Sequence, residues 1–313
     1  VLRNVNLSNV DLSGANLTNA QLAGANLTGA NLSGATLTGV SSGGIIGTPS
    51  ALPSGWILGG GLLLGPGVPL AGLDLTGANL AGFDLTSVNL SRTNLTNANL
   101  SGTNLTRASL AGTVLNGANL TNANLSGATI STVDLTGVTL TGANLTGAKF
   151  SGLTGTAAAL PTGGKVFNGF LLAPGVDLTG LNLTGVNLTG VSLAQATMTN
   201  VVSSGVTGTP IALADGYGVF SGYLVGPGAN LSGANLRGLD LRTVSLDSVN
   251  LSGASLVGAN LTNVRFYGAN LTAANLLNAV LTGADLRNVT WSNTTCPSGS
   301  NSSYVPGNTC VGQ

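Results

Sequence analysis

The sequence predicts an all-β solenoid, a fold in which the chain coils around its own apolar core. A large apolar residue, usually leucine, recurs at every fifth position over most of the 313 residues. Small polar residues and 49 glycines fill most of the places between. Because 43% of the residues are hydrophobic and only 6% are charged, the chain lacks the low hydrophobicity and high charge of disordered proteins.

The five-residue period determines how the chain must turn. In a straight strand, residues five apart point to opposite faces, and in a helix they lie about 140° apart around the axis. Every central leucine can face one interior only if the chain turns a corner once per repeat. The fifth residue is usually Gly or Asn, which tolerate the positive φ that a corner needs. The chain therefore coils around its leucines, and successive coils pair as short strands.

The repeats fall into four blocks of one predicted solenoid, residues 1–295. The blocks are residues 1–40, 68–151, 176–200 and 229–292. The inserts between them are residues 41–69, 152–177 and 201–230. The segments Gly44–Leu70, Gly152–Leu178 and Gly205–Leu231 cover most of each insert and the first central leucine after it; they have equal length and align without gaps. Residues 296–313 lie beyond the last repeat and are expected to form a C-terminal loop or cap.

The typical repeat is Ala-Asn-Leu-Thr-Gly, as at Ala143–Gly147. This unit resembles the A-[DN]-L-x-x motif of the pentapeptide-repeat protein family. The resemblance covers more than two thirds of the chain, with dozens of units in register. It implies a right-handed quadrilateral β-helix with four repeats per coil. The residues by themselves indicate one corner every five residues, without fixing how many corners close a coil.

Each insert is predicted to contain a short apolar hairpin. In the second insert, Asn168-Gly169 lies between apolar residues and suits a two-residue type I′ turn. Gly60-Gly61 and Ser221-Gly222 occupy the same places in the other two. The hairpins either pack over the core or form exposed contacts with a neighbouring molecule. The candidate contact residues are Trp56, Leu58, Leu62, Phe167, Phe170, Phe220 and Tyr223.

The chain has two cysteines, Cys296 and Cys310, on either side of a polar, turn-rich stretch. This arrangement favours a disulfide over two free thiols and indicates an extracellular or cell-surface location. A disulfide across a loop of this length contributes about 3 kcal/mol on the chain-entropy interpretation.

No chemistry-bearing constellation appears in the sequence, so no enzymatic activity, metal site or cofactor is expected. Histidine is absent, which excludes His-based triads and His metal sites. Most of the nine acidic residues directly precede a central residue, an outward position. Phosphate-binding and dinucleotide fingerprints are missing. No apolar run approaches the roughly 18–20 residues of a membrane span.

The leading functional hypothesis is a secreted structural protein that associates with copies of itself into a filament or surface layer. The formal net charge is 0, so little charge repulsion keeps copies apart. The sequence starts inside a repeat, and uncapped solenoid ends expose strand edges that another chain can extend. Val1, Leu2 and Trp291 are the candidate end-stacking residues. A passive display or adhesion stalk on a larger exported protein shares these features.

Two further hypotheses come from other functional classes. The best-known activity of the resembled family is protection of DNA gyrase by mimicry of duplex DNA, which requires a dense negative surface. Nine acidic and nine basic residues disfavour it, and no basic stripe indicates nucleic-acid binding. Ice binding is the other hypothesis, because residues after the central leucines would stack in outward ladders at twenty-residue spacing. These ladders are Thr86, Thr106, Ser126 and Thr146, and Thr76, Thr96, Asn116 and Thr136.

Overall fold

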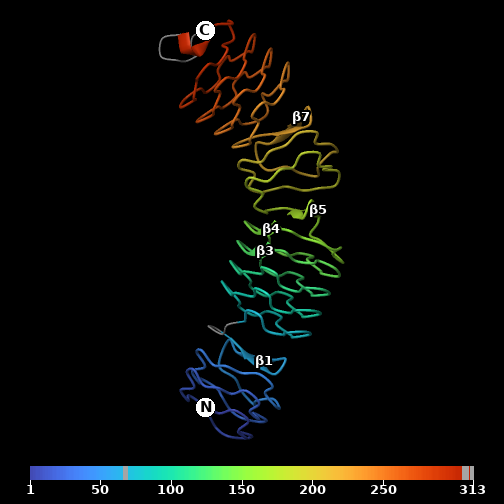
Figure 1. Cartoon of the computed structure of the whole chain (residues 1–313), viewed down its shortest axis with the longest axis vertical. Helices are drawn as coiled ribbons and strands as arrows, with labels where there is room; N and C mark the ends of the chain where they lie inside the picture. The colour runs from blue at the N-terminus through green and yellow to red at the C-terminus, as the bar shows by residue number, and fades with distance from the viewer. Residues whose placement is uncertain (66–69, 305–309, 311–313) are drawn as a thin grey trace. The chain divides into compact units, whose positions relative to one another are not determined.

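The computed structural model describes residues 1–65, 70–304 and 310. The chain forms two compact units, one of residues 1–162 with 168–171 and the other of residues 163–167 with 172–313. Each unit is a stack of coils in which the backbone turns a corner at every repeat (Figure 1). The division between the two units falls within the second insert.

Four repeats close one coil, because parallel bridges join residues that lie twenty positions apart. Asn6 bridges Asn26 in the first unit, and Asn250 bridges Asn270 in the second. The backbone hydrogen bonds follow the same register: the N–H of Leu105 donates to the carbonyl of Asn124 (2.7 Å). The four-sided coil implied by the family resemblance is therefore confirmed.

The central residues fill the interior of each unit. Leu95, Leu100 and Leu105 are fully buried, and so is Ala98, two positions before a central leucine. Some of these second inward positions hold threonine instead of alanine. The buried hydroxyl of Thr103 donates to the carbonyl of Leu80 (2.8 Å), so the polar group is satisfied inside the core.

The corners have the positive φ that the fifth position predicts. Gly102 has φ 64°, and Asn97 has φ 56°. Arg92 and Arg107 adopt the same conformation, with φ 59° and 58°. The repeat geometry therefore imposes a left-handed corner even on residues that rarely choose one.

Most repeats contribute a single bridging residue, and only a few segments are long enough to count as strands. Strands β3 (Thr129–Ser131) and β4 (Lys149–Ser151) pair in parallel. The remaining strands belong to the inserts: β1 (Ile57–Gly59), β2 (Leu62–Leu64), β5 (Lys165–Phe167), β6 (Phe170–Leu172), β7 (Gly218–Phe220) and β8 (Tyr223–Val225). A short 3₁₀ helix, η1 (Ser302–Tyr304), follows the last coil.

The inserts contain the predicted hairpins. Strands β1 and β2 pair antiparallel across Gly60-Gly61, and β7 and β8 pair across Ser221-Gly222. Both residues of each turn have positive φ, as a type I′ turn requires. Asn168 and Gly169, between β5 and β6, have positive φ as well.

The hairpins are part of the coils. Before the first hairpin, Ile46 and Ala51 still bridge the preceding coil at Asn26 and Asn31. The hairpin then lengthens the coil: Asn230, after the third hairpin, bridges Val202 instead of a residue twenty positions earlier. The second strands turn inward, since Leu63, Leu64, Leu224 and Val225 are all fully buried.

Candidate functional site

The most regular outward surface of the first unit is a double column that we call the Asn–hydroxyl ladder. One column is Asp84, Asn104, Asn124 and Asn144, and the other is Thr86, Thr106, Ser126 and Thr146. Parallel bridges between successive members of the first column place both columns in register. The predicted stacking of the second column is therefore confirmed.

Nearly all side-chain donors and acceptors of this ladder are hydrogen-bonded to other members of it. The Oδ1 atom of Asn124 accepts from the N–H and the hydroxyl of Ser126 (3.2 and 2.6 Å) and from Nδ2 of Asn144 (3.2 Å). Its Nδ2 donates to Oδ1 of Asn104 (3.3 Å) and Oγ1 of Thr106 (3.0 Å). The hydroxyl hydrogens are committed to neighbouring side chains, which weakens the ice-binding hypothesis because few donors remain to order water.

The second predicted column follows the same principle less regularly. The hydroxyls of Thr96 and Thr136 donate to Asn94 (2.6 Å) and Asp134 (2.7 Å). Nδ2 of Asn116 also donates to Asp134, at 3.1 Å. Val114 interrupts the adjoining column and is 42% exposed.

Aspartates in the ladders are held as carboxylates. The Thr86 hydroxyl and N–H both donate to Asp84 and lower its pKa. Thr136 lowers the pKa of Asp134 in the same way, with a further contribution from Asn116. Hydrogen bonds to the ionised form favour it, so these groups are poor proton donors and are suited to a structural role.

Charged side chains gather in the second unit, in what we call the Arg–Asp–Tyr cluster: Asp247, Arg265, Tyr267, Asp285 and Arg287. Arg265 pairs with Asp247 (2.6 Å), and Arg287 pairs with Asp285 (2.8 Å) and lies over the Tyr267 ring (5.9 Å to its centroid). Hydrogen bonds from Arg287 lower the pKa of Asp285 to about 2. Each acid already has a partner, so the cluster stabilises adjacent coils.

A ring packs over a glycine in the first and third inserts. Trp56 covers Gly65, and Tyr217 covers Gly226, closely enough that a Cβ on either glycine would overlap the ring. The Tyr217 hydroxyl lies within hydrogen-bond distance of the carbonyls of Met198 (3.0 Å) and Pro227 (2.5 Å), which share its single hydrogen. Burial raises the pKa of this phenol. In the second insert the same two places hold Gly164 and Ala173, so the ring and the glycine change together.

The candidate contact residues of the hairpins are all partly buried. Trp56 and Leu58 pack against the core of the first unit, and Phe220 and Tyr223 pack against that of the second. Leu62, Phe167 and Phe170 are also intermediate in exposure. The four that pack against a core contribute to their own units. For all seven, a contact with another molecule stays a prediction.

The candidate end-stacking residues differ in exposure. Val1 is 91% exposed, whereas Leu2 is partly buried. Trp291 is partly buried and packs against the core of the second unit. Their role in stacking stays a prediction.

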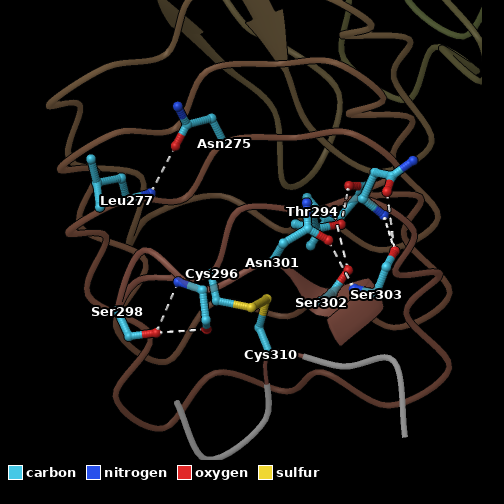
Figure 2. Close-up of a disulfide and its surroundings, with 12 residues drawn as sticks. Asn275, Leu277, Thr294, Cys296, Ser298, Asn301, Ser302, Ser303 and Cys310 are labelled. Atoms are coloured by element: carbon cyan, nitrogen blue, oxygen red, sulfur yellow. Dashed lines mark hydrogen bonds between the residues drawn. A yellow bond between two sulfur atoms is a disulfide. The ribbon is translucent and has the colours of Figure 1, made fainter. Parts of the chain in front are cut away.

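The two cysteines form a disulfide at the last described coil (Figure 2). Both are buried, at 0% and 2% exposure. The chain folds back here, because Thr295 pairs antiparallel with Asn301 and the N–H of Thr294 donates to the Ser302 hydroxyl (3.0 Å). Of the predicted C-terminal loop, residues 305–309 and 311–313 lie outside the described residues.

Within the described part of the chain, no group of three or more Asp, Glu, His or Cys side chains is arranged to hold a metal ion. No buried side-chain nitrogen or oxygen there lacks a hydrogen-bond partner. The described residues also form no helix of the length and hydrophobicity that a membrane crossing requires.

The fold and its outward ladders define a β-solenoid built from five-residue repeats. The Pentapeptide repeats family matches in eight copies, over residues 1–40, 74–112, 98–137, 113–152, 174–202, 228–263 and 265–294. The chain therefore belongs to the pentapeptide repeat family, and its fold is a right-handed β-helix.

Solved structures of pentapeptide repeat proteins are similar to this chain. HetL from the cyanobacterium Nostoc sp. strain PCC 7120, which is involved in heterocyst differentiation regulation, is 24% identical; the match covers 96% of this chain and 93% of HetL, with a TM-score of 0.25. Rfr23 from the cyanobacterium Cyanothece 51142 is 30% identical over 43% of this chain and 63% of Rfr23 (TM-score 0.26). A thylakoid-lumen pentapeptide repeat protein of Arabidopsis thaliana is 30% identical over 40% of this chain and 71% of its own (TM-score 0.24). No curated protein matches the chain.

Proposed function

We propose that this chain is a non-enzymatic structural protein of the cell surface or extracellular space that associates with copies of itself. The Asn–hydroxyl ladder carries the proposal. Its polar side chains bond to one another along the stack instead of converging on a reacting centre. Such a surface suits repeated contact over a large area.

Self-association is supported by the low penalty for removing this surface from water. Burying a polar group is unfavourable when its hydrogen bonds are lost, but the bonds of Asn104 and Asn124 lie within the ladder and survive contact. The formal net charge of 0 adds no long-range repulsion between copies. An export location is supported by the buried disulfide, since disulfides persist in oxidising compartments.

The test measures the assembly state of the purified chain by sedimentation velocity and electron microscopy over a range of concentrations. We expect filaments or sheets that grow with concentration. A double variant, Thr106→Lys with Thr146→Lys, places like charges on the ladder and is expected to dissociate the assemblies. The control is Thr179→Lys with Thr184→Lys, which adds the same charge at exposed places outside the ladder. Monodisperse monomers of the unaltered chain at high concentration would contradict the proposal.

A further inference from the structure

A hollow of about 290 Å³ lies beside the third hairpin. It forms where the hairpin lengthens the coil, so that Asn230 lies next to Val202 instead of above a polar residue of a regular ladder. Val202, Ser204, Tyr223, Asn230 and Ser232 line it, together with Ser203, Leu231, Gly233 and Ala234. All of these residues belong to the second unit.

An unused donor lies at the edge of this hollow. Asn230 is the first rung of a ladder: its Oδ1 accepts from Nδ2 of Asn250 (3.3 Å) and from the N–H of Ser232 (3.2 Å). Among the described residues, none accepts a hydrogen bond from Nδ2 of Asn230. Two ladders of the first unit begin on acids, Asp11 and Asp84. Each accepts a hydrogen bond from the next rung, and its side chain has no N–H that needs an acceptor.

An aromatic ring forms another wall. Tyr223 packs against the core of the second unit, and its hydroxyl oxygen accepts weakly from the N–H of Asn235 (3.4 Å). The phenol hydrogen remains available as a donor. The hydroxyls of Ser204 and Ser232 add groups that both donate and accept. The hollow therefore combines a flat apolar surface with several polar groups.

From these features we propose that the hollow binds one ring of a neutral carbohydrate. None of the residues lining it is charged, which disfavours an ionic ligand. A sugar ring has an apolar face for Tyr223 and hydroxyls that accept from Asn230 and exchange hydrogen bonds with the serines. The proposal is independent of self-association, because the hollow lies outside the Asn–hydroxyl ladder.

The other inserts supply natural comparisons. The first insert has Leu62 at the place of Tyr223 and Ala71 at the place of Ser232. The second has Phe170 and, at the place of Asn230, Asp177. The combination of a phenol ring with a carboxamide is found in the third insert, so binding is assigned there.

The experiment is NMR titration of the ¹⁵N-labelled chain, at a concentration where sedimentation shows it dispersed. The probes are the methyl glycosides of glucose, mannose, galactose and N-acetylglucosamine, with glycerol as the polyol control. At least one glycoside is expected to shift the Asn230 side-chain NH₂ signals saturably, with a dissociation constant on the order of 1 mM, and glycerol is not.

Tyr223→Leu, which copies the first insert, is expected to weaken binding at least about tenfold, a difference of about 1.4 kcal/mol. Phe170→Leu in the second insert is the matched control and leaves binding unchanged. Asn230→Asp removes both the donor and its NH₂ signals, and weaker binding is measured there by the backbone amide signals of the lining residues. Unchanged backbone spectra and melting temperatures show that the variants fold. The proposal is overturned if no glycoside shifts these signals, if glycerol shifts them equally, or if the shifts persist in Tyr223→Leu.

Discussion

At the scale of single residues, asparagine before the central leucine has two tasks. Its Oδ1 accepts from the N–H two residues later, as Asn104 does from Thr106 (3.2 Å), which stiffens the corner. Its Nδ2 donates to the previous coil, as from Asn104 to Asp84 (3.1 Å). The sequence pattern predicts the outward position. It does not predict the second bond, because that partner is known only once four repeats are known to close a coil.

Asn124→Ala is expected to destabilise the first unit by about 1–2 kcal/mol, since it removes bonds to the rungs above and below. Chemical denaturation followed by circular dichroism measures this. The matched control is Asn182→Ala, because Asn182 accepts a bond from the N–H of Thr184 (3.0 Å) and no rung bond is seen in the described residues. Equal losses in the two variants would show that the rung bonds contribute nothing.

The Asp240–Arg242 pair should make the stability of the fold depend on pH. Hydrogen bonds from Arg242 lower the pKa of Asp240 from 3.8 to about 2. The folded-state pKa lies below the unfolded one, so the stabilisation is complete above pH 3.8 and is lost as the pH falls towards 2. Titration of the Asp240 carboxyl by ¹³C NMR is expected to show this low midpoint. Arg242→Ala is expected to return it towards 3.8, and an unchanged midpoint would refute the assignment.

At the scale of elements, each insert hairpin is held at its turn by a backbone hydrogen bond from an earlier residue of the same insert. The N–H of Ile45 donates to Gly61, that of Leu153 to Gly169 and that of Val206 to Gly222, all at 2.9 Å. The hairpins themselves could be predicted, because Asn-Gly between apolar residues suits the positive φ that a type I′ turn requires. The ring-over-glycine packing could not, because it depends on how the chain re-enters the coil after the turn.

Gly226→Ala is expected to destabilise the second unit by about 1–3 kcal/mol, because the new Cβ overlaps the Tyr217 ring. Adding Tyr217→Gly recreates the Gly164 and Ala173 combination of the second insert and is expected to relieve the overlap. Thermal unfolding of the single and double variants measures the effect. If Gly226→Ala costs as much stability in a Tyr217→Gly background as in the natural chain, the ring is not the cause.

The disulfide closes the fold-back at the last described coil. Replacing Cys296 and Cys310 together by alanine is expected to lower stability by roughly 3 kcal/mol, chiefly by freeing the unfolded chain. Thermal unfolding with and without reductant measures this, and the variant itself should not respond to reductant. Hydrogen exchange at Thr294 and Ser302 should rise as the antiparallel pairing loosens. A reductant-insensitive natural chain would contradict the prediction.

At the scale of the whole molecule, the fold could be predicted from the sequence because the same short repeat recurs along the chain. The five-residue repeat explains the core, the corners and the outward polar positions, and each coil repeats them. The division into two compact units was not predicted, because the leucine period resumes unchanged after the second insert. The hollow beside Tyr223 also could not be predicted, since it arises from an offset between coils.

Balanced charge gives a whole-molecule prediction. At pH 7 the nine basic groups offset the nine acids. As the pH falls below about 3 some of the carboxyls take up protons, with Asp240 and Asp285 protonated last because their pKa values are about 2. A net positive charge results, and repulsion should weaken self-association. Light scattering at pH 7 and pH 2.5, with circular dichroism to confirm folding, measures the change. Added salt at pH 2.5 should restore association by screening, and scattering that is independent of pH would contradict the prediction.

The hydrogen bonds of the Asn–hydroxyl ladder run in one direction along the stack. Its carboxamides all donate the same way: Asn144 to Asn124, Asn124 to Asn104, and Asn104 to Asp84. The aligned amide dipoles add along the stack, with the positive end at the Asp84 carboxylate. The Asp84 carboxylate places a full negative charge at this end, so the two ends of the ladder differ electrically. Two such faces brought together keep their Asp84 charges apart when they run in opposite directions, so paired copies should lie antiparallel.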